Sequence, residues 1–126
     1  MTDTPIDSVL KHFTGKGVGV VFLVPTPIGY NKSIMDATKP LRLFLEEHGI
    51  HNYELQAQGP ENKKTVPAFF VFPDRVEETE ASLYRPKTKS GDPRIWFRGL
   101  RQYCTPQNLL AITTDGESIF VFNMSN

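Results

Sequence analysis

The sequence lacks several features that define familiar protein classes. It has one cysteine, Cys104, in 126 residues, which excludes an internal disulfide and a cage of thiolates around a metal. No apolar run approaches the roughly 20 residues of a membrane-spanning helix, and residues 1–5 are acidic and polar. We therefore expect one cytoplasmic domain that covers residues 1–126 and has a single hydrophobic core.

Signatures of catalysis are also scarce. A common class of metal-dependent nucleases needs an acid after one strand and Glu-x-Lys on the next, which together hold a divalent cation. Asp74 follows an apolar run, but Glu54, Glu78 and Glu80 have no lysine two positions later. The three histidines lack the spacing of metal ligands. We predict that this chain is not itself an enzyme and has no catalytic residue, no metal and no cofactor.

Positive charge is concentrated in one part of the chain. Fourteen Lys and Arg residues balance fourteen Asp and Glu residues, which excludes a generally basic protein that coats nucleic acid. The stretch from Arg85 to Arg101, however, holds six of the fourteen cations and a single acid, Asp92. Guanidinium groups suit bidentate contacts with phosphate. We interpret this stretch as a surface that faces an anion.

A helix is predicted in the second half of this basic stretch. Asp92 is a favourable N-cap, and Pro93 is a favourable first helical residue. A helix that begins there has three arginines on one face and apolar residues on the opposite face. The arginines are Arg94, Arg98 and Arg101, and the apolar residues are Trp96, Leu100 and Tyr103. Arginines are also common on the merely solvated face of an amphipathic helix, so both interpretations stay open.

The remaining pattern is mainly that of short strands. Apolar runs and alternation predict strands at residues 18–24, 53–57, 65–72, 76–84, 109–113 and 118–123, and an Asp-Gly turn joins the last two as a hairpin. Helical spacing predicts helices at residues 6–13 and from Ser33 or Thr38 to His48. Strands outnumber the crossovers of a doubly wound sheet. We predict an α+β, mainly β fold: a mixed or antiparallel barrel of six or seven strands with helices at its openings.

Three stretches of the sequence resemble the N-terminal part of restriction endonucleases of the MvaI/BcnI type. They are SLYRPKTKSGDPRIWF at residues 82–97, MDA at residues 35–37 with Leu41 and Arg42, and QAQGP at residues 56–60. In such enzymes an N-terminal module can be an effector DNA-binding domain similar to the EcoRII N-terminal domain and the plant B-three domain. The resemblance implies an open pseudobarrel of about seven strands, with two helices at its ends and two arms that grip the major groove. No nuclease motif accompanies it, which implies an excised reader domain or a stand-alone relative.

We therefore expect a sequence-specific double-stranded DNA-binding domain, the effector module of a type IIE-like restriction endonuclease whose nuclease domain lies outside this chain. Phosphate contacts that set the register are assigned to Arg85, Lys87, Lys89, Arg94 and Arg98. Contacts to base edges are assigned to Tyr30, Asn31 and Lys32, with Gln56 and Gln58 as weaker candidates. Five or six phosphate contacts predict a log–log salt slope of about −4 to −5.

Alternative functions remain at this point. Arg94, Lys87 and Asp92 could surround a phosphorylated small molecule in a ligand-binding domain or a small enzyme. The basic stretch could instead dock an acidic protein partner, or the chain could be the nuclease itself. The sequence does not specify the recognised bases or the oligomeric state.

Overall fold

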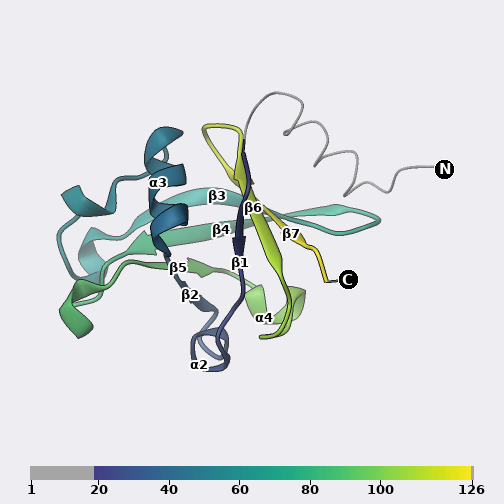
Figure 1. The fold of residues 1–126 in the computed structure, drawn as a ribbon, viewed down its shortest axis with the longest axis horizontal. Coiled ribbons are helices and arrows are strands. Elements are labelled where there is room, and N and C mark those ends of the chain that lie inside the picture. Colours follow the sequence, from purple (N-terminus) through teal and green to yellow (C-terminus); the bar gives the residue numbers. More distant parts are fainter. Residues whose placement is uncertain (1–18, 126) are drawn as a thin grey trace.

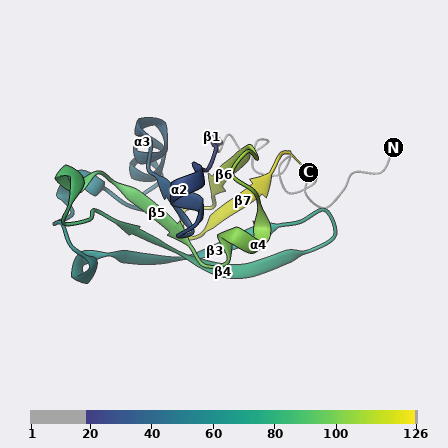
Figure 2. The same cartoon turned by 90° about the horizontal axis from the view of Figure 1, so that it is seen from below.

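Residues 19–125 are described by the computed structural model, and they form one mixed sheet of seven strands (Figure 1). The strands are β1 (Val21–Leu23), β2 (Ile34–Asp36), β3 (Lys64–Val71), β4 (Val76–Tyr84), β5 (Arg94–Phe97), β6 (Leu110–Thr114) and β7 (Ile119–Asn123). Their order is β1-β6-β7-β3-β4-β5-β2, and every neighbouring pair is antiparallel except β3 and β7. The sheet curls into a half-barrel (Figure 2), which confirms the predicted α+β, mainly β, open barrel.

Three short helices accompany the sheet in the described part of the chain. They are α2 (Pro27–Tyr30), α3 (Lys39–Glu47) and α4 (Leu100–Tyr103). Single 3-10 turns occur at Tyr53–Leu55, Pro60–Asn62 and Lys89–Gly91. Within residues 19–125, no helix has the length and apolar character needed to cross a membrane.

The core lies on the concave face of the sheet. Because side chains alternate along a strand, every second residue of β4 and β5 points inward. Leu83, Ile95 and Phe97 have no exposed area. α3 buries Leu41 and Leu45 against them in the same core. The alternate residues of β4 and β5 therefore point outward, on the face that carries the candidate site.

α3 begins at the later of its two predicted positions. The Thr38 hydroxyl accepts a hydrogen bond from the backbone N–H of Leu41 at 3.4 Å, and Pro40 lies in the first turn, where its missing N–H is tolerated. Gly49, with φ of +72°, follows the end of the helix. Ile34, which the helical pattern had included, lies in β2 because β2 pairs with β5.

The helix predicted from Pro93 onward is wrong. Arg94–Phe97 is strand β5, which is hydrogen-bonded to β4 on one side and to β2 on the other. Burial alternates along it, with Ile95 and Phe97 inside. Two ladders of backbone hydrogen bonds and two buried apolar side chains outweigh the local helix-start signal of Asp92 and Pro93. The first helical residues after Pro93 are those of α4, which follows Gly99 at φ of +80°.

Other sequence predictions have mixed outcomes. The strands predicted at 65–72 and 76–84 and the C-terminal hairpin are confirmed as β3, β4, β6 and β7, and the strand predicted at 18–24 is shorter, as β1. The strand predicted at 53–57 is wrong, because the Asn52 side chain accepts from the Glu54 N–H at 3.0 Å and starts a 3-10 turn. Leu55, expected inside, is 85% exposed. The helix predicted at 6–13 lies outside the described residues.

Tyr103 of α4 ties the one parallel pair of the sheet together. Its hydroxyl lies 2.6 Å from the carbonyl oxygen of Val71 on β3 and 2.9 Å from that of Val121 on β7. The same oxygen accepts a hydrogen bond from the backbone N–H of Asn123 at 2.9 Å. The ring stacks on Phe70 at a centroid distance of 4.4 Å. α4 is thus held to the sheet by one buried hydroxyl and one ring.

Candidate nucleic-acid interface

The candidate site is the outward face of β4, β5 and β2. Since Ile95 and Phe97 point into the core, Arg94 and Trp96 of β5 point outward. The strand registers then define the neighbours of these two side chains. Arg94 lies opposite Tyr84 of β4 and Asp36 of β2, and Trp96 lies opposite Ser82 and Ile34. The arrangement places one guanidinium, two large aromatic rings and small polar groups on one face.

Two connections flank this face, and we call them the α2 arm (residues 25–33) and the β4–β5 arm (residues 85–93). β2 and β5 are antiparallel, with Ile34 opposite Trp96 and Asp36 opposite Arg94. The α2 arm therefore enters at the Trp96 end of the pair, and the β4–β5 arm enters at the Arg94 end. Figure 1 shows α2 and this second connection projecting separately from the sheet.

Each arm contains one strained residue. Ser33 at the end of the α2 arm has φ of 60°, and Ser90 in the β4–β5 arm has φ of 59°. They are the two non-glycine residues with positive φ within residues 19–125. A side chain in this region costs energy, so the surrounding contacts hold both arms in their conformations.

Arg85 is part of the scaffold of its arm. Its Nε donates to the carbonyl oxygen of Gly91 at 2.9 Å, and its Nη1 donates to that of Gln56 at 3.2 Å. The Gln56 amide nitrogen in turn lies 2.8 Å from each of the carbonyl oxygens of Asn62 and Leu83. Both side chains were assigned to DNA from the sequence, but the Gln56 amide nitrogen and two of the three guanidinium nitrogens of Arg85 donate to backbone carbonyls. Their best-supported role is to position the arm.

Replacing Arg85 by alanine should loosen the β4–β5 arm. The substitution removes both hydrogen bonds that the Arg85 guanidinium forms across the arm. Lysine would not replace them, because its single ammonium group cannot form the same two-pronged contact. We expect trypsin to cleave the folded Arg85→Ala chain after Lys87 about tenfold faster than the unchanged chain, since cleavage follows local opening. Mass spectrometry of timed digests measures this rate. Equal rates for the two chains would contradict a scaffold role.

The other predicted site residues occupy different environments. The Tyr30 hydroxyl donates to the carbonyl oxygen of Arg101 at 3.0 Å, which anchors the α2 arm on α4. Arg98 forms an ion pair with Glu80. Lys87 is exposed and lies 3.9 Å from a carboxylate oxygen of Glu61. Asn31 and Lys32 lie on the α2 arm and are exposed, and Lys89 lies in the 3-10 turn of the β4–β5 arm. Gln58 is exposed and belongs to neither arm, but it packs against Gly91 of the β4–β5 arm.

Arg94 and Lys32 line one hollow of about 220 Å³ between the α2 arm and the sheet. Asp36 lines the same hollow. The Arg94 Nε atom is buried and has no hydrogen-bond partner, which is uncommon for a buried donor. Burial raises the pKa of the neighbouring Tyr84 hydroxyl, and the Arg94 guanidinium acts against this rise. Arg94 is thus a cation with an unused donor at the centre of the face.

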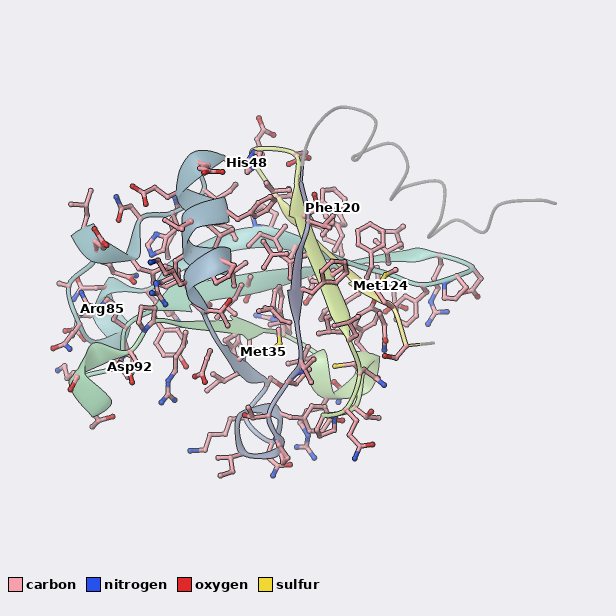
Figure 3. All side chains as sticks on the ribbon, viewed as in Figure 1. Met35, His48, Arg85, Asp92, Phe120 and Met124 are labelled. Carbon is pink, nitrogen blue, oxygen red and sulfur yellow. The ribbon has the colours of Figure 1, made fainter. Side chains whose placement is uncertain are left out.

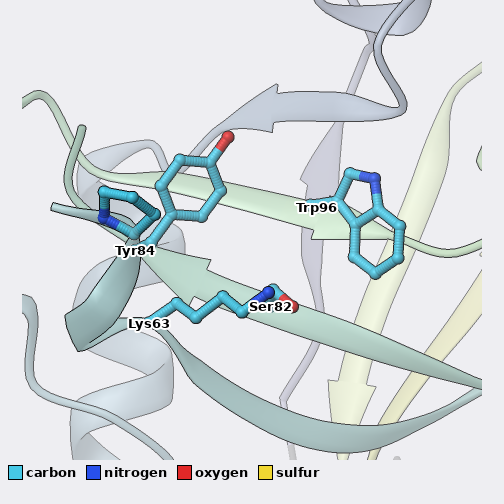
Figure 4. A pocket seen from close by; sticks show the side chains of 5 residues that line it. Lys63, Ser82, Tyr84 and Trp96 are labelled. Atoms are coloured by element: carbon cyan, nitrogen blue, oxygen red, sulfur yellow. The ribbon is translucent and has the colours of Figure 1, made fainter. Parts of the chain in front are cut away.

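A second hollow, of about 270 Å³, lies next to the first on the outward face (Figure 4). It is lined by Pro60, Lys63, Ser82, Tyr84 and Trp96. This hollow was not expected from the sequence, because the helix predicted from Pro93 turned Trp96 toward the core and separated it from Ser82 and Tyr84. Reading residues 82–84 and 94–97 as paired strands would have found it.

The expected orientation of the basic stretch also changes. Arg94, Arg98 and Arg101 were predicted to share one helical face with Trp96 opposite, but Arg94 and Trp96 share a strand face. Figure 3 shows Arg85 and Asp92 at one end of the molecule, away from Phe120 and Met124. Arg94 lies in β5, Arg98 is paired with Glu80 and Arg101 lies in α4, so the cations of the stretch do not form one helical stripe.

A Glu-x-Lys sequence does occur at Glu61–Lys63, although the prediction above found none. Glu61 lies in a 3-10 turn before β3, so the acid is not on the strand after Asp74. Within residues 19–125 no three His, Cys, Asp or Glu side chains gather closely enough to hold a metal.

Comparison with known protein families, curated proteins and solved structures finds no match to this chain. The similarity to MvaI/BcnI-type endonucleases and to the EcoRII N-terminal domain therefore remains a prediction from the sequence.

Proposed function

We propose that this chain binds double-stranded DNA in a sequence-specific manner, as the effector or targeting module of a restriction endonuclease whose nuclease domain lies outside the chain. The observation that carries the proposal is the outward face of β4, β5 and β2, with Arg94 at its centre and an arm at each end. This arrangement agrees with the two-armed grip that the sequence resemblance implies.

The spacing of the arms suits the major groove. Three residue pairs join β2 and β5, and a strand rises about 3.3 Å per residue, so the roots of the arms are about 7 Å apart along the strands. This separation is smaller than the groove width of about 12 Å. The roots of both arms can therefore face the same groove.

The charges of this face suit phosphate. Lys32, Lys63 and Arg94 form no ion pair with any residue of the described chain, and the pair between Lys87 and Glu61 is long and exposed. Exposed pairs of this kind are weak and yield readily to a phosphate. The acids on this face are Asp36 of β2 and, by alternation along β4, Glu78 and Glu80, of which Glu80 is paired with Arg98. The Asp36 carboxylate can accept a hydrogen bond from the amino group of cytosine.

The first experiment is a selection of bound duplexes from a random pool, followed by anisotropy titrations of the enriched sequence. Arg85 and Arg98 are engaged elsewhere, so the cations available to phosphate are Lys32, Lys63, Lys87 and Arg94. Four phosphate contacts give an expected log–log salt slope of about −3 to −4. Arg94→Ala and Lys32→Ala should each weaken binding about tenfold for all duplexes and reduce the slope by about one.

The matched control is Arg75→Ala. Arg75 is an exposed arginine between β3 and β4, paired with Asp74 and Glu77 at the far tip of the hairpin, and its removal should leave binding unchanged. Binding without enrichment would remove sequence specificity from the proposal. No binding to any duplex would overturn it and favour a phosphorylated small molecule in the hollow beside Arg94 and Lys32.

A further inference from the structure

We propose that the hollow lined by Tyr84 and Trp96 holds one unpaired base of a bound DNA strand, stacked against the face of one of these rings. The inference rests on the proposed function and adds a specificity to it: a preference for duplexes that contain a base out of the stack.

The positions of the two rings suit a planar guest. Trp96 lies directly opposite Ser82 across β4 and β5, and Tyr84 is two residues further along β4. Figure 4 shows the two rings side by side, with their flat faces turned the same way and not toward each other. A base that has left the stack can lie flat against one ring at a carbon–carbon contact distance of about 3.5 Å, with the other ring at its edge. Neither ring stacks on another aromatic ring of the described residues.

Polar groups at the rim suit the edge of a base. The Ser82 hydroxyl can donate or accept, and the Lys63 ammonium can donate. Figure 4 shows the Lys63 side chain extending along the hollow toward Ser82. Neither of these two side chains forms a hydrogen bond or an ion pair with a described residue. Their hydrogen-bonding capacity is available to a ligand.

The size of the hollow selects a single ring system. Its volume of about 270 Å³ lies below the range of about 300–1,000 Å³ for pockets that enclose drug-sized ligands. A paired base cannot enter, because its faces are covered by its neighbours in the duplex, so the base must leave the stack. Arg94, opposite Tyr84 across the strand pair, is placed to hold the phosphate beside such a base.

The test uses the single tryptophan of the chain, Trp96, as a reporter. The full chain is titrated with a fully paired duplex and with the same duplex carrying one base opposite an abasic site. Dye anisotropy measures affinity, and tryptophan fluorescence measures stacking. We expect the second duplex to bind about tenfold more tightly, since base–aromatic stacking is strong, and to quench Trp96 fluorescence by stacking.

Variants separate stacking from a general loss of folding. Tyr84→Ala and Trp96→Ala should bring the affinity ratio of the two duplexes close to one, whereas Tyr84→Phe and Trp96→Phe, which keep an aromatic face, should retain more of the preference. Phe22→Ala removes an aromatic ring that is 54% exposed on β1, at the other edge of the sheet, and should leave the ratio unchanged. Circular dichroism checks that each variant is folded.

The outcomes distinguish this inference from the function on which it rests. Equal affinity for the two duplexes, with unchanged Trp96 fluorescence, would overturn the base-binding hollow and leave the DNA-binding proposal standing. Failure to bind either duplex would overturn the proposed function itself. A preference that survives Tyr84→Ala and Trp96→Ala would show that the unpaired base binds elsewhere, which also overturns the inference.

Discussion

Replacing Tyr103 by phenylalanine is expected to lower the free energy of unfolding by about 2 to 3 kcal/mol. The ring, which stacks on Phe70, is retained, so the change removes only the hydroxyl. The Asn123 N–H then loses its acceptor, and the carbonyl oxygens of Val71 and Val121 lose the one hydroxyl proton that lies between them. These groups are buried, and leaving them unsatisfied costs more than the net gain of an ordinary hydrogen bond.

Urea titrations followed by circular dichroism measure this loss. The matched control is Tyr30→Phe, which also removes a hydroxyl that donates to a backbone carbonyl, that of Arg101. Water can replace this exposed bond, so we expect a loss below about 0.5 kcal/mol. Equal effects of the two substitutions would contradict the role of Tyr103 as a buried link between β3 and β7.

The second large effect is a loss of stability at high pH. Tyr53 and Tyr103 are 3% and 6% exposed, and burial raises the pKa of both hydroxyls above the usual value of 10. Burial also raises the pKa of the Cys104 thiol to about 11. Each group is neutral in the folded chain over a pH range in which the unfolded chain loses the proton.

The direction in which stability changes with pH follows from the number of protons that the folded and unfolded chains bind. A group with a raised folded pKa stabilises the fold fully below its unfolded pKa and loses this contribution as the pH rises toward the folded pKa. The loss is about 1.4 kcal/mol per pH unit for each proton. It begins near pH 9 with Cys104 and continues above pH 10 with the two tyrosines, and the three groups together remove about 3 kcal/mol per unit near pH 10.5. The half-buried Tyr84, whose pKa is also raised, adds a smaller share.

Urea titrations between pH 8 and about pH 11 measure this dependence. Tyr103→Phe removes one of the three protons and should reduce the slope above pH 10 by about one third. A slope that is the same in both chains would show that Tyr103 ionises in the folded state. Stability that stays constant to pH 11 would contradict the burial of all three groups.

Several elements could be predicted because their signals are local. The run from Thr65 to Phe72 is apolar and rich in aromatic and β-branched residues, and the C-terminal hairpin has Asp115 and Gly116 at its turn. α3 follows from helical spacing and from the capping hydroxyl of Thr38. In each case, the hydrogen bonds or side-chain contacts that decide the structure lie within a short stretch of chain.

β5 shows where local signals mislead. Asp92 and Pro93 are good helix-start residues, and the strand-forming run Ile95–Phe97 is too short to outweigh them by itself. The competing interactions come from β2 and β4, about 60 and 10 residues earlier in the chain. The error also affected the predicted site. In the structure Trp96 lies on the outward face and not in the core, and Arg98 lies next to Glu80.

The sequence by itself determined the mainly β class, the concentration of cations between Arg85 and Arg101, and the two connections that were assigned to DNA, since composition and short-range periodicity suffice for these. The tertiary structure decided which cations remain available and which rings face outward. Arg85 is held by the carbonyl groups of Gly91 and Gln56, and Trp96 joins Tyr84 in a hollow through strand register. Both outcomes depend on contacts between residues that are distant in sequence, and the energies of such contacts are absent from any local pattern.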